Sequence, residues 1–172
     1  MADGQYNRRR EECEVALRLA REQGQSADHL GGIAVSELDA LVRVIPAPWS
    51  LRLRHVVSET ARTREAARAL ARHDQAELGR LLVEGHDSLR RNFESSCPEA
   101  DYLVESALQY GALGARLTGG GWGGAVVVLL PPDRAARSVG EIQERFRQAF
   151  GRVPVTWSTK ARGGVRREKF AL

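Results

Sequence analysis

Hydrophobic residues recur every three to four positions through the first two thirds of the chain, which is the period of an amphipathic α-helix. In residues 7–23, Cys13, Ala16, Leu17 and Ala20 fall on one helical face, and Gly24 is a helix terminator. The same pattern predicts four more helices, and the two prolines of "IPAPWS" break the chain between the first two of them. These helices are expected at 36–42, 51–73, from 75 to about 93 and 98–110, with Ser36, Asp74 and Ser96 as N-caps and Gly111 as a terminator.

The helix that follows Asp74 has a strongly periodic apolar stripe in which a glycine takes one position. Gly85 within this stripe indicates that another helix or a strand approaches closely. His86 lies beside the stripe, and we interpret it as a residue at the edge of the helix rather than as a ligand. The stripe consists of Leu78, Leu82, Gly85, Leu89 and Phe93.

The pattern changes after residue 111 and favours strands. "ARLT" (115–118) is typical of a short strand, and "AVVVLL" (125–130) is β-branched and fully apolar, which predicts a buried strand. An amphipathic helix is expected over 137–151, and the alternation of "VPVTWSTK" (153–160) predicts a half-buried strand. "RGGVRREKF" (162–170) is typical of a turn followed by a last strand. The fold class is therefore predicted as α+β.

Charge and composition narrow the class of protein. The formal net charge is +4, but acidic residues interrupt most basic stretches, as in "RRREECE" (8–14), which is typical of solvated helix faces rather than of a nucleic-acid-binding surface. No apolar run approaches the roughly 20 residues of a membrane helix, and the charged amino terminus has no signal-peptide core. We therefore expect a cytoplasmic protein with neither nucleic acid nor membrane as partner. Cys13 and Cys97 form no C-x-x-C pair, which predicts reduced thiols and no zinc site.

Five glycines fill six positions between the two predicted strands, at 119–124. Gly119, Gly121 and Gly124 spell G-x-G-x-x-G, but a dinucleotide fingerprint needs a helix after the loop, and here a strand follows. A simple hairpin turn needs one or two glycines, so five indicate a further demand on the backbone. Either its N–H groups face an anion, or it packs against a second loop. Trp122 is a lid over the loop or, as we favour, a packed anchor.

The stretch "GALGARLTGGGWGGAVVVLLP" (111–131) resembles the third signature motif of the GHMP small-molecule kinases, in its galactokinase form. The resemblance implies the C-terminal domain of that family, with helices packed on one face of a small, mostly antiparallel sheet that contains ferredoxin-like β-α-β elements. It also implies a division into an N-terminal helical segment (1–50) and the C-terminal domain (51–172). Four more motifs appear in the family's order: "YNRRREECEVA" (6–16), "RHVVSETART" (54–63), "GRLLVEGHDSLRRNFESSCPEAD" (79–101) and "WSTKARGG" (157–164).

The resemblance implies ATP-dependent phosphorylation of the anomeric hydroxyl of galactose, with Mg²⁺. The family's Ser-rich phosphate loop and its catalytic aspartate match no part of these 172 residues, so we expect the carboxyl half of a galactokinase, with no catalytic residue and no metal ligand of its own. We expect it to be inactive alone. Tyr6 corresponds to a sugar contact. The active-site loop corresponds to Gly119, Gly120, Gly121, Trp122, Gly123 and Gly124.

Several alternatives stay open at this point. "GWGG" with the later "TK" is similar to the branch that contains N-acetylgalactosamine kinase and the plant and fungal galactokinases, so the sugar is galactose or N-acetylgalactosamine. Ala125 departs from the family, which usually has Cys there. The chain could partner a separate N-terminal kinase half or associate with itself through an exposed apolar face. A non-enzymatic module that senses galactose or ATP is the other function class.

Overall fold

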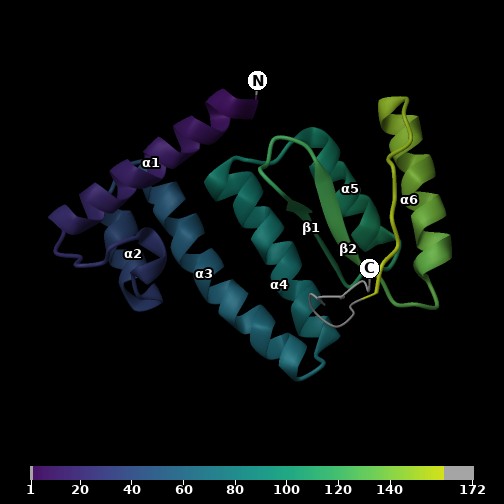
Figure 1. Cartoon of the computed structure of the whole chain (residues 1–172), viewed down its shortest axis with the longest axis horizontal. Helices are drawn as coiled ribbons and strands as arrows, with labels where there is room; N and C mark the ends of the chain where they lie inside the picture. Colours follow the sequence, from purple (N-terminus) through teal and green to yellow (C-terminus); the bar gives the residue numbers. More distant parts are fainter. Residues whose placement is uncertain (1, 161–172) are drawn as a thin grey trace, which may run out of the picture.

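The computed structural model describes residues 2–160, and α-helices make up most of that stretch (Figure 1). Helices fill the first two thirds, and a β-hairpin with a last helix follows, which confirms the predicted α+β class with a small antiparallel sheet. In chain order the elements are α1 (Ala2–Glu22), the 3₁₀ turn η1 (Leu30–Gly32), α2 (Val35–Val44), α3 (Trp49–Ala71), α4 (Gln75–Ser88), the π-helical turn η2 (Leu89–Phe93), α5 (Pro98–Gln109), β1 (Gly114–Thr118), β2 (Ala125–Leu129) and α6 (Ala135–Phe150).

A first hydrophobic core lies between α1, α2 and α3, at the left of Figure 1. Leu53 of α3 is fully buried there, and burial of one leucine stabilises the fold by about 2 kcal/mol. This core draws on both sides of residue 50, and the division of the chain at that position stays a prediction. Its buried members are Ala16, Ala20, Leu30, Ile33, Leu38, Leu41, Ile45, Leu53 and Val57.

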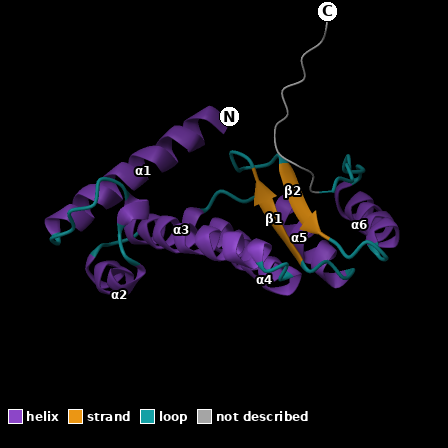
Figure 2. Cartoon of the chain, turned by 60° about the horizontal axis from the view of Figure 1, so that its bottom comes forward, coloured by secondary structure: helices purple, strands orange, loops and turns teal. Residues whose placement is uncertain are grey.

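A second core joins the hairpin to α5 and α6. β1 and β2 pair antiparallel, with Ala115 opposite Val128 and Leu117 opposite Val126. Figure 2 shows α5 behind the hairpin and α6 on the side of β2. Val104 and Ala107 of α5, Ala115 of β1 and Ile142 of α6 form the buried centre, with Val126 and Val128 packed against it. The inward side chains of both strands therefore share one face, as a half-covered antiparallel sheet requires.

The helix α4 crosses β1 through a contact between two glycines. A Cβ on Gly79 would lie 2.1 Å from the carbonyl oxygen of Leu113, and a Cβ on Gly114 would lie 2.3 Å from that of Gly79. The predicted close approach at Gly85 is also present, because a Cβ there would lie 2.8 Å from Arg116 Nη1. The closest backbone contact is nevertheless nearly two helical turns earlier, at Gly79, and Leu78 and Leu82 of the predicted stripe are only half-buried.

Two of the predicted N-caps are wrong, and one is confirmed. Asp74 caps α4, because Oδ1 accepts from the Glu77 N–H at 3.0 Å. α2 begins at Val35, before Ser36, and Ala34 holds its cap position. Cys97 holds the cap position of α5, while the hydroxyl of Ser96 donates to Asp101 Oδ1 at 2.5 Å instead. Pro98 lies in the first turn of α5, and Gly111 follows it at φ +88°, both as expected.

The predictions for β2 and for the two strands expected after it are partly wrong. β2 forms, but its outward side chains are not buried, and Val127 is 49% exposed. Residues 153–160 are extended chain outside the sheet, with Val153, Val155 and Trp157 exposed. The Gln143 side chain donates instead to Pro154 O at 3.3 Å and to Thr156 Oγ1 at 3.2 Å, which holds this segment along α6. The last predicted strand (162–170) lies outside the described residues.

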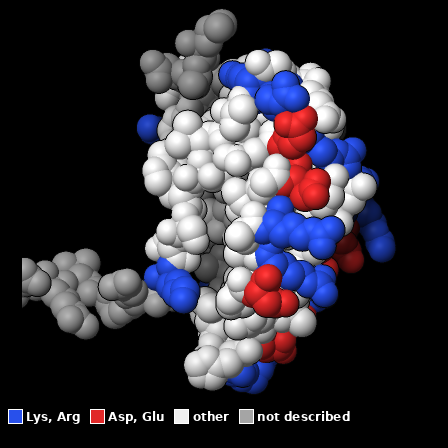
Figure 3. All heavy atoms as spheres, turned by 90° about the vertical axis from the view of Figure 1, so that its right-hand side faces the viewer, with Lys and Arg blue, Asp and Glu red and all other residues white. Residues whose placement is uncertain are grey.

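The outer face of α6 carries charges of both signs. Arg137, Glu141, Glu144 and Arg147 are exposed, and Arg147 pairs with Glu144 at 2.7 Å. On the face drawn in Figure 3, basic and acidic side chains alternate in one band beside an uncharged area. This face therefore has the mixed charge of a solvated helix rather than a basic surface of one sign.

Candidate functional site

The backbone of the β1–β2 loop explains four of its five glycines. Gly119, Gly121, Gly123 and Gly124 all have positive φ, at +94°, +90°, +135° and +96°. Such dihedrals are open to glycine and costly for residues with a Cβ. Trp122 also has positive φ, at +55°. The loop is therefore a run of left-handed backbone rather than a two-residue turn.

The middle of the loop packs against a second segment, which contains Ser95. The N–H of Trp122 donates to Ser95 O at 2.6 Å. A Cβ on Gly121 would lie 2.8 Å from that oxygen and 2.9 Å from Ser95 Cβ. In contrast, a Cβ on Gly119, Gly120 or Gly123 would meet nothing within 4 Å. Packing against a second loop thus accounts for Gly121, while the other glycines have open space beside them.

The amino-terminal end of α1 reaches this loop through Arg9. Its guanidinium carbon lies 5.9 Å from the centre of the Trp122 ring and 5.7 Å from that of Phe93, within cation–π range. Trp122 is half-buried, in the position of a packed anchor. Tyr6 is 59% exposed and lies three residues before Arg9, on the same helical face. Figure 1 places the amino end of α1 and the loop at the same end of the molecule. The two predicted parts of the site are therefore neighbours.

A buried ion cluster that the sequence reasoning missed lies beneath this junction. Arg52 of α3 has a side chain only 2% exposed, and it donates to Glu12 Oε2 at 2.7 Å, to Asn92 O at 2.6 Å and to Glu94 Oε2 at 2.5 Å. Arg9 pairs with the same Glu12 carboxylate and donates to Glu94 O at 3.4 Å. The cluster therefore ties α1 and α3 to residues 92–94, directly before the segment that supports the loop.

The charges within the cluster keep Glu12 ionised. Burial raises the pKa of its carboxyl, but the hydrogen bond from Arg52 and the charges of Arg52 and Arg9 outweigh burial, so the pKa is lowered. Glu94 adopts the left-handed conformation, with φ +51°. Because "RRREECE" is also the pattern of an exposed helix face, the sequence carried no signal that these charges are buried.

His86 is buried rather than placed at a helix edge, which corrects the sequence interpretation. It is 5% exposed, and its Nδ1 accepts from the Leu117 N–H at 3.3 Å. Its Nε2 lies 3.1 Å from Asp101 Oδ1. Burial lowers the pKa of His86, although the Asp101 carboxylate acts in the opposite direction. The imidazole is therefore neutral and lies between β1 and α5.

A second buried histidine, His55, lies behind the η2 turn. Its Nδ1 is 2.9 Å from Ser88 Oγ, which also accepts from Asn92 Nδ2 at 3.1 Å. The ring packs against Phe93 with 4.4 Å between centroids. Burial lowers the pKa of His55 to about 4, while the Glu59 carboxylate acts in the opposite direction and the nearby arginines act with burial. This histidine is neutral at physiological pH.

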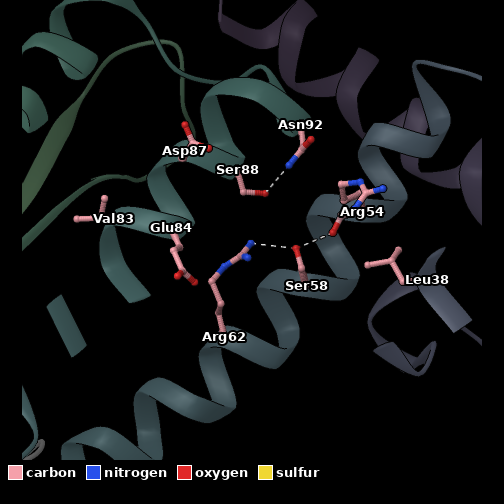
Figure 4. A pocket seen from close by; sticks show the side chains of 9 residues that line it. All are labelled: Leu38, Arg54, Ser58, Arg62, Val83, Glu84, Asp87, Ser88 and Asn92. Atoms are coloured by element: carbon pink, nitrogen blue, oxygen red, sulfur yellow. Dashed lines mark hydrogen bonds between the residues drawn. The ribbon is translucent and has the colours of Figure 1, made fainter. Parts of the chain in front are cut away.

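An open groove of about 510 Å³ lies between α2, α3 and α4 (Figure 4). Its side chains bond mainly to one another: Arg62 Nη2 donates to Ser58 Oγ at 3.0 Å, and Ser58 Oγ donates to Arg54 O at 2.6 Å. Two arginines face two carboxylates, Glu84 and Asp87, so the groove has no single charge. None of the predicted site residues lines it.

The described residues offer no metal site. Among residues 2–160, no three side chains of His, Cys, Asp or Glu are arranged to hold a metal ion. We derive no step through Mg²⁺. None of the described helices is both long and apolar enough to span a membrane. Cys13 and Cys97 are free thiols, as expected.

Comparison with known proteins identifies the family. The family model described as GHMP kinases C terminal matches residues 66–148. Human galactokinase is 43% identical over 148 residues, which are 85% of this chain and 36% of the relative. The galactokinase of Streptomyces coelicolor is 35% identical over 168 residues, which are 96% of this chain and 42% of the relative. The chain therefore spans about two fifths of the length of these curated relatives.

Solved structures agree with this assignment. Lactococcus lactis galactokinase complexed with galactose superposes with a TM-score of 0.80 at 31% identity, over 87% of this chain and 39% of that one. Leishmania major mevalonate kinase in complex with R-mevalonate has a TM-score of 0.53 at 29% identity, over 67% and 35%. The chain belongs to the GHMP kinases as a C-terminal domain of that family, and the relatives that it matches at 35–43% identity are galactokinases.

Proposed function

We propose that the chain forms the carboxyl-terminal part of a galactokinase-type active site, in which ATP phosphorylates the anomeric hydroxyl of galactose. One observation carries this proposal: the glycine loop has open backbone next to the end of α1 that bears Tyr6, and Arg9 joins the two. The similarity to galactokinases supports the reaction class, and the galactose in the Lactococcus lactis complex supports the choice of sugar.

The glycine loop and Tyr6 have distinct roles in this proposal. Phosphoryl transfer depends mainly on positioning and on neutralising charge. Alternation of left-handed and other backbone conformations turns successive N–H groups toward one side, where they can receive phosphate oxygens. Gly119 and Gly121 have positive φ and Gly120 between them does not, and Gly119 and Gly120 have open space beside them. The exposed Tyr6 hydroxyl then bonds a hydroxyl of the sugar. The phosphate loop and the catalytic acid come from a segment outside these 172 residues.

The binding test uses isothermal titration of the 172-residue chain with ATP, galactose and N-acetylgalactosamine. We expect Tyr6→Phe to weaken galactose binding about fivefold, because it removes one hydrogen bond worth about 1 kcal/mol. Gly121→Ala should weaken ATP binding, since the new Cβ displaces the loop from Ser95. Gly140→Ala is the control, because Gly140 lies in α6 rather than in the glycine loop and nothing lies within 4 Å of its Cβ. Wild-type affinity for galactose in Tyr6→Phe and for ATP in Gly121→Ala would argue against the proposal.

The turnover test separates a kinase from a sensor. The chain replaces the matching region of Streptomyces coelicolor galactokinase, and galactose-dependent ADP release is measured. We expect turnover in the folded chimera and none in the 172-residue chain alone. A chimera that binds both ligands without turnover would favour the non-enzymatic alternative.

A further inference from the structure

The glycine loop is tied to the rest of the domain at two points. At its base, the Leu117 N–H in β1 donates to His86 Nδ1 at 3.3 Å. At its middle, the Trp122 N–H donates to Ser95 O at 2.6 Å. Leu117 is 2% exposed and lies two positions before Gly119, so the first contact holds the residue from which the loop departs.

The contacts at Leu117 and at Trp122 both lead to the Ser95–Ser96 segment. Because His86 Nδ1 accepts from Leu117, the ring proton is on Nε2, which lies 3.1 Å from Asp101 Oδ1. That carboxylate oxygen accepts a hydrogen bond from Ser96 Oγ at 2.5 Å. Ser96 follows Ser95, which accepts from Trp122. His86 Nε2 and Asp101 Oδ1 are in electrostatic contact at 3.1 Å without the geometry of a hydrogen bond. Through this contact, the base of the loop is linked to the Ser95–Ser96 segment that holds its middle.

We propose that His86 is a positioning residue for the glycine loop, because its neutral imidazole spans β1 and Asp101 and so fixes the base of the loop relative to the Ser95–Ser96 segment. The consequence for substrate rests on the proposed function, since a loop that shifts at its base moves the N–H groups offered to ATP. The positioning itself is a property of this chain and is measurable without ligand.

The charges around the ring favour this role near neutral pH. Asp101 of α5, Arg90 of η2 and Arg116 of β1 face His86. Burial and the two arginines disfavour the imidazolium, whereas Asp101 favours it. A proton on Nδ1 would meet the Leu117 N–H, donor against donor, and release the base of the loop. Protonation of Nδ1 at low pH should therefore loosen the loop.

Trp122 reports on the loop directly. In a background with Trp49→Phe and Trp157→Phe, acrylamide quenching of fluorescence measures the exposure of Trp122 alone. We expect His86→Leu to raise the quenching constant about twofold at pH 7, because the unpaired Leu117 N–H allows local opening. His55→Leu is the matched control, since His55 has similar burial and no contact with the loop. Far-UV circular dichroism confirms that each variant is folded.

Conservative variants distinguish positioning from simple packing. His86→Asn keeps an acceptor near Nδ1, and His86→Gln keeps a donor near Nε2, so each should recover part of the wild-type quenching. A folded His86→Leu variant with wild-type quenching, or a His55→Leu variant with an equal rise, would overturn the proposal. ATP titration adds an independent arm. If quenching changes as expected but wild-type protein binds no ATP, the proposed function fails while the positioning role stands.

Discussion

The backbone of Gly79 in α4 lies against the backbone of Gly114 in β1, with no side chain between them. Contact of this kind places the helix closer to the strand than any residue with a Cβ allows. It joins the helical first part of the chain to the hairpin that carries the glycine loop.

Substitution of either glycine tests this contact. Gly79→Ala and Gly114→Ala should each destabilise the protein by about 3 kcal/mol, because the new Cβ would overlap a backbone carbonyl that cannot rotate away. Urea unfolding followed by circular dichroism measures the loss. Gly140→Ala is the control, since Gly140 lies in α6 with open space around it, and it should stabilise by about 1 kcal/mol. Similar midpoints for all three variants would contradict the contact.

Removal of one cation from the buried cluster should be far more damaging than removal of an exposed one. Arg52→Met leaves Glu12 without the more deeply buried of its two cationic partners, and we expect a loss of about 4 kcal/mol in the free energy of unfolding. Arg10→Met removes an exposed pair with Glu14 and should change stability by less than about 0.5 kcal/mol. A double-mutant cycle of Arg52→Met with Glu12→Gln should give a coupling energy above about 1 kcal/mol. Additive effects would refute direct pairing.

His55 should make stability depend on pH above the range in which carboxyl groups titrate. Its pKa is about 4 in the folded protein and 6.5 ordinarily, so between these values the unfolded chain binds more protons and stability rises with pH. From pH 7 down to pH 5, this one group should lower the free energy of unfolding by about 2 kcal/mol. Urea midpoints at several pH values measure the slope.

His55→Gln should flatten that slope, whereas His29→Gln, at an exposed position, should leave it unchanged. Some slope remains in His55→Gln, because burial also lowers the pKa of His86. If His55→Gln kept the full wild-type slope, groups other than His55 would be responsible for the pH dependence of stability.

The helix starts that the sequence predicts correctly depend on short-range interactions. Asp74 caps its helix and Pro98 begins another because each acts on backbone within one turn. The roles proposed for the glycine loop and for Tyr6 came from the resemblance to a family rather than from periodicity. The alternation of Val153, Val155 and Trp157 matches a strand, but a strand also needs a neighbour to pair with, and the pattern carries no information on that neighbour.

Long-range contacts explain what the sequence does not predict. Arg52 stands in "LRLR", which resembles a solvated helix face, and its acceptors lie about 40 residues away on either side. His86 is buried only because β1 and α5 close over it. In both cases a polar residue is buried by partners that the local pattern cannot reveal.

The ion cluster also sets an order for events during synthesis. Arg52 has three acceptors, of which Glu12 precedes it and Asn92 and Glu94 follow it. On a ribosome, α1 and α3 are complete while two of these acceptors are still untranslated, and an arginine without them favours water over the interior. We therefore expect the packing of Arg52 between α1 and α3 to be completed only once residues 92–94 are available, and these residues directly precede Ser95, against which the glycine loop packs.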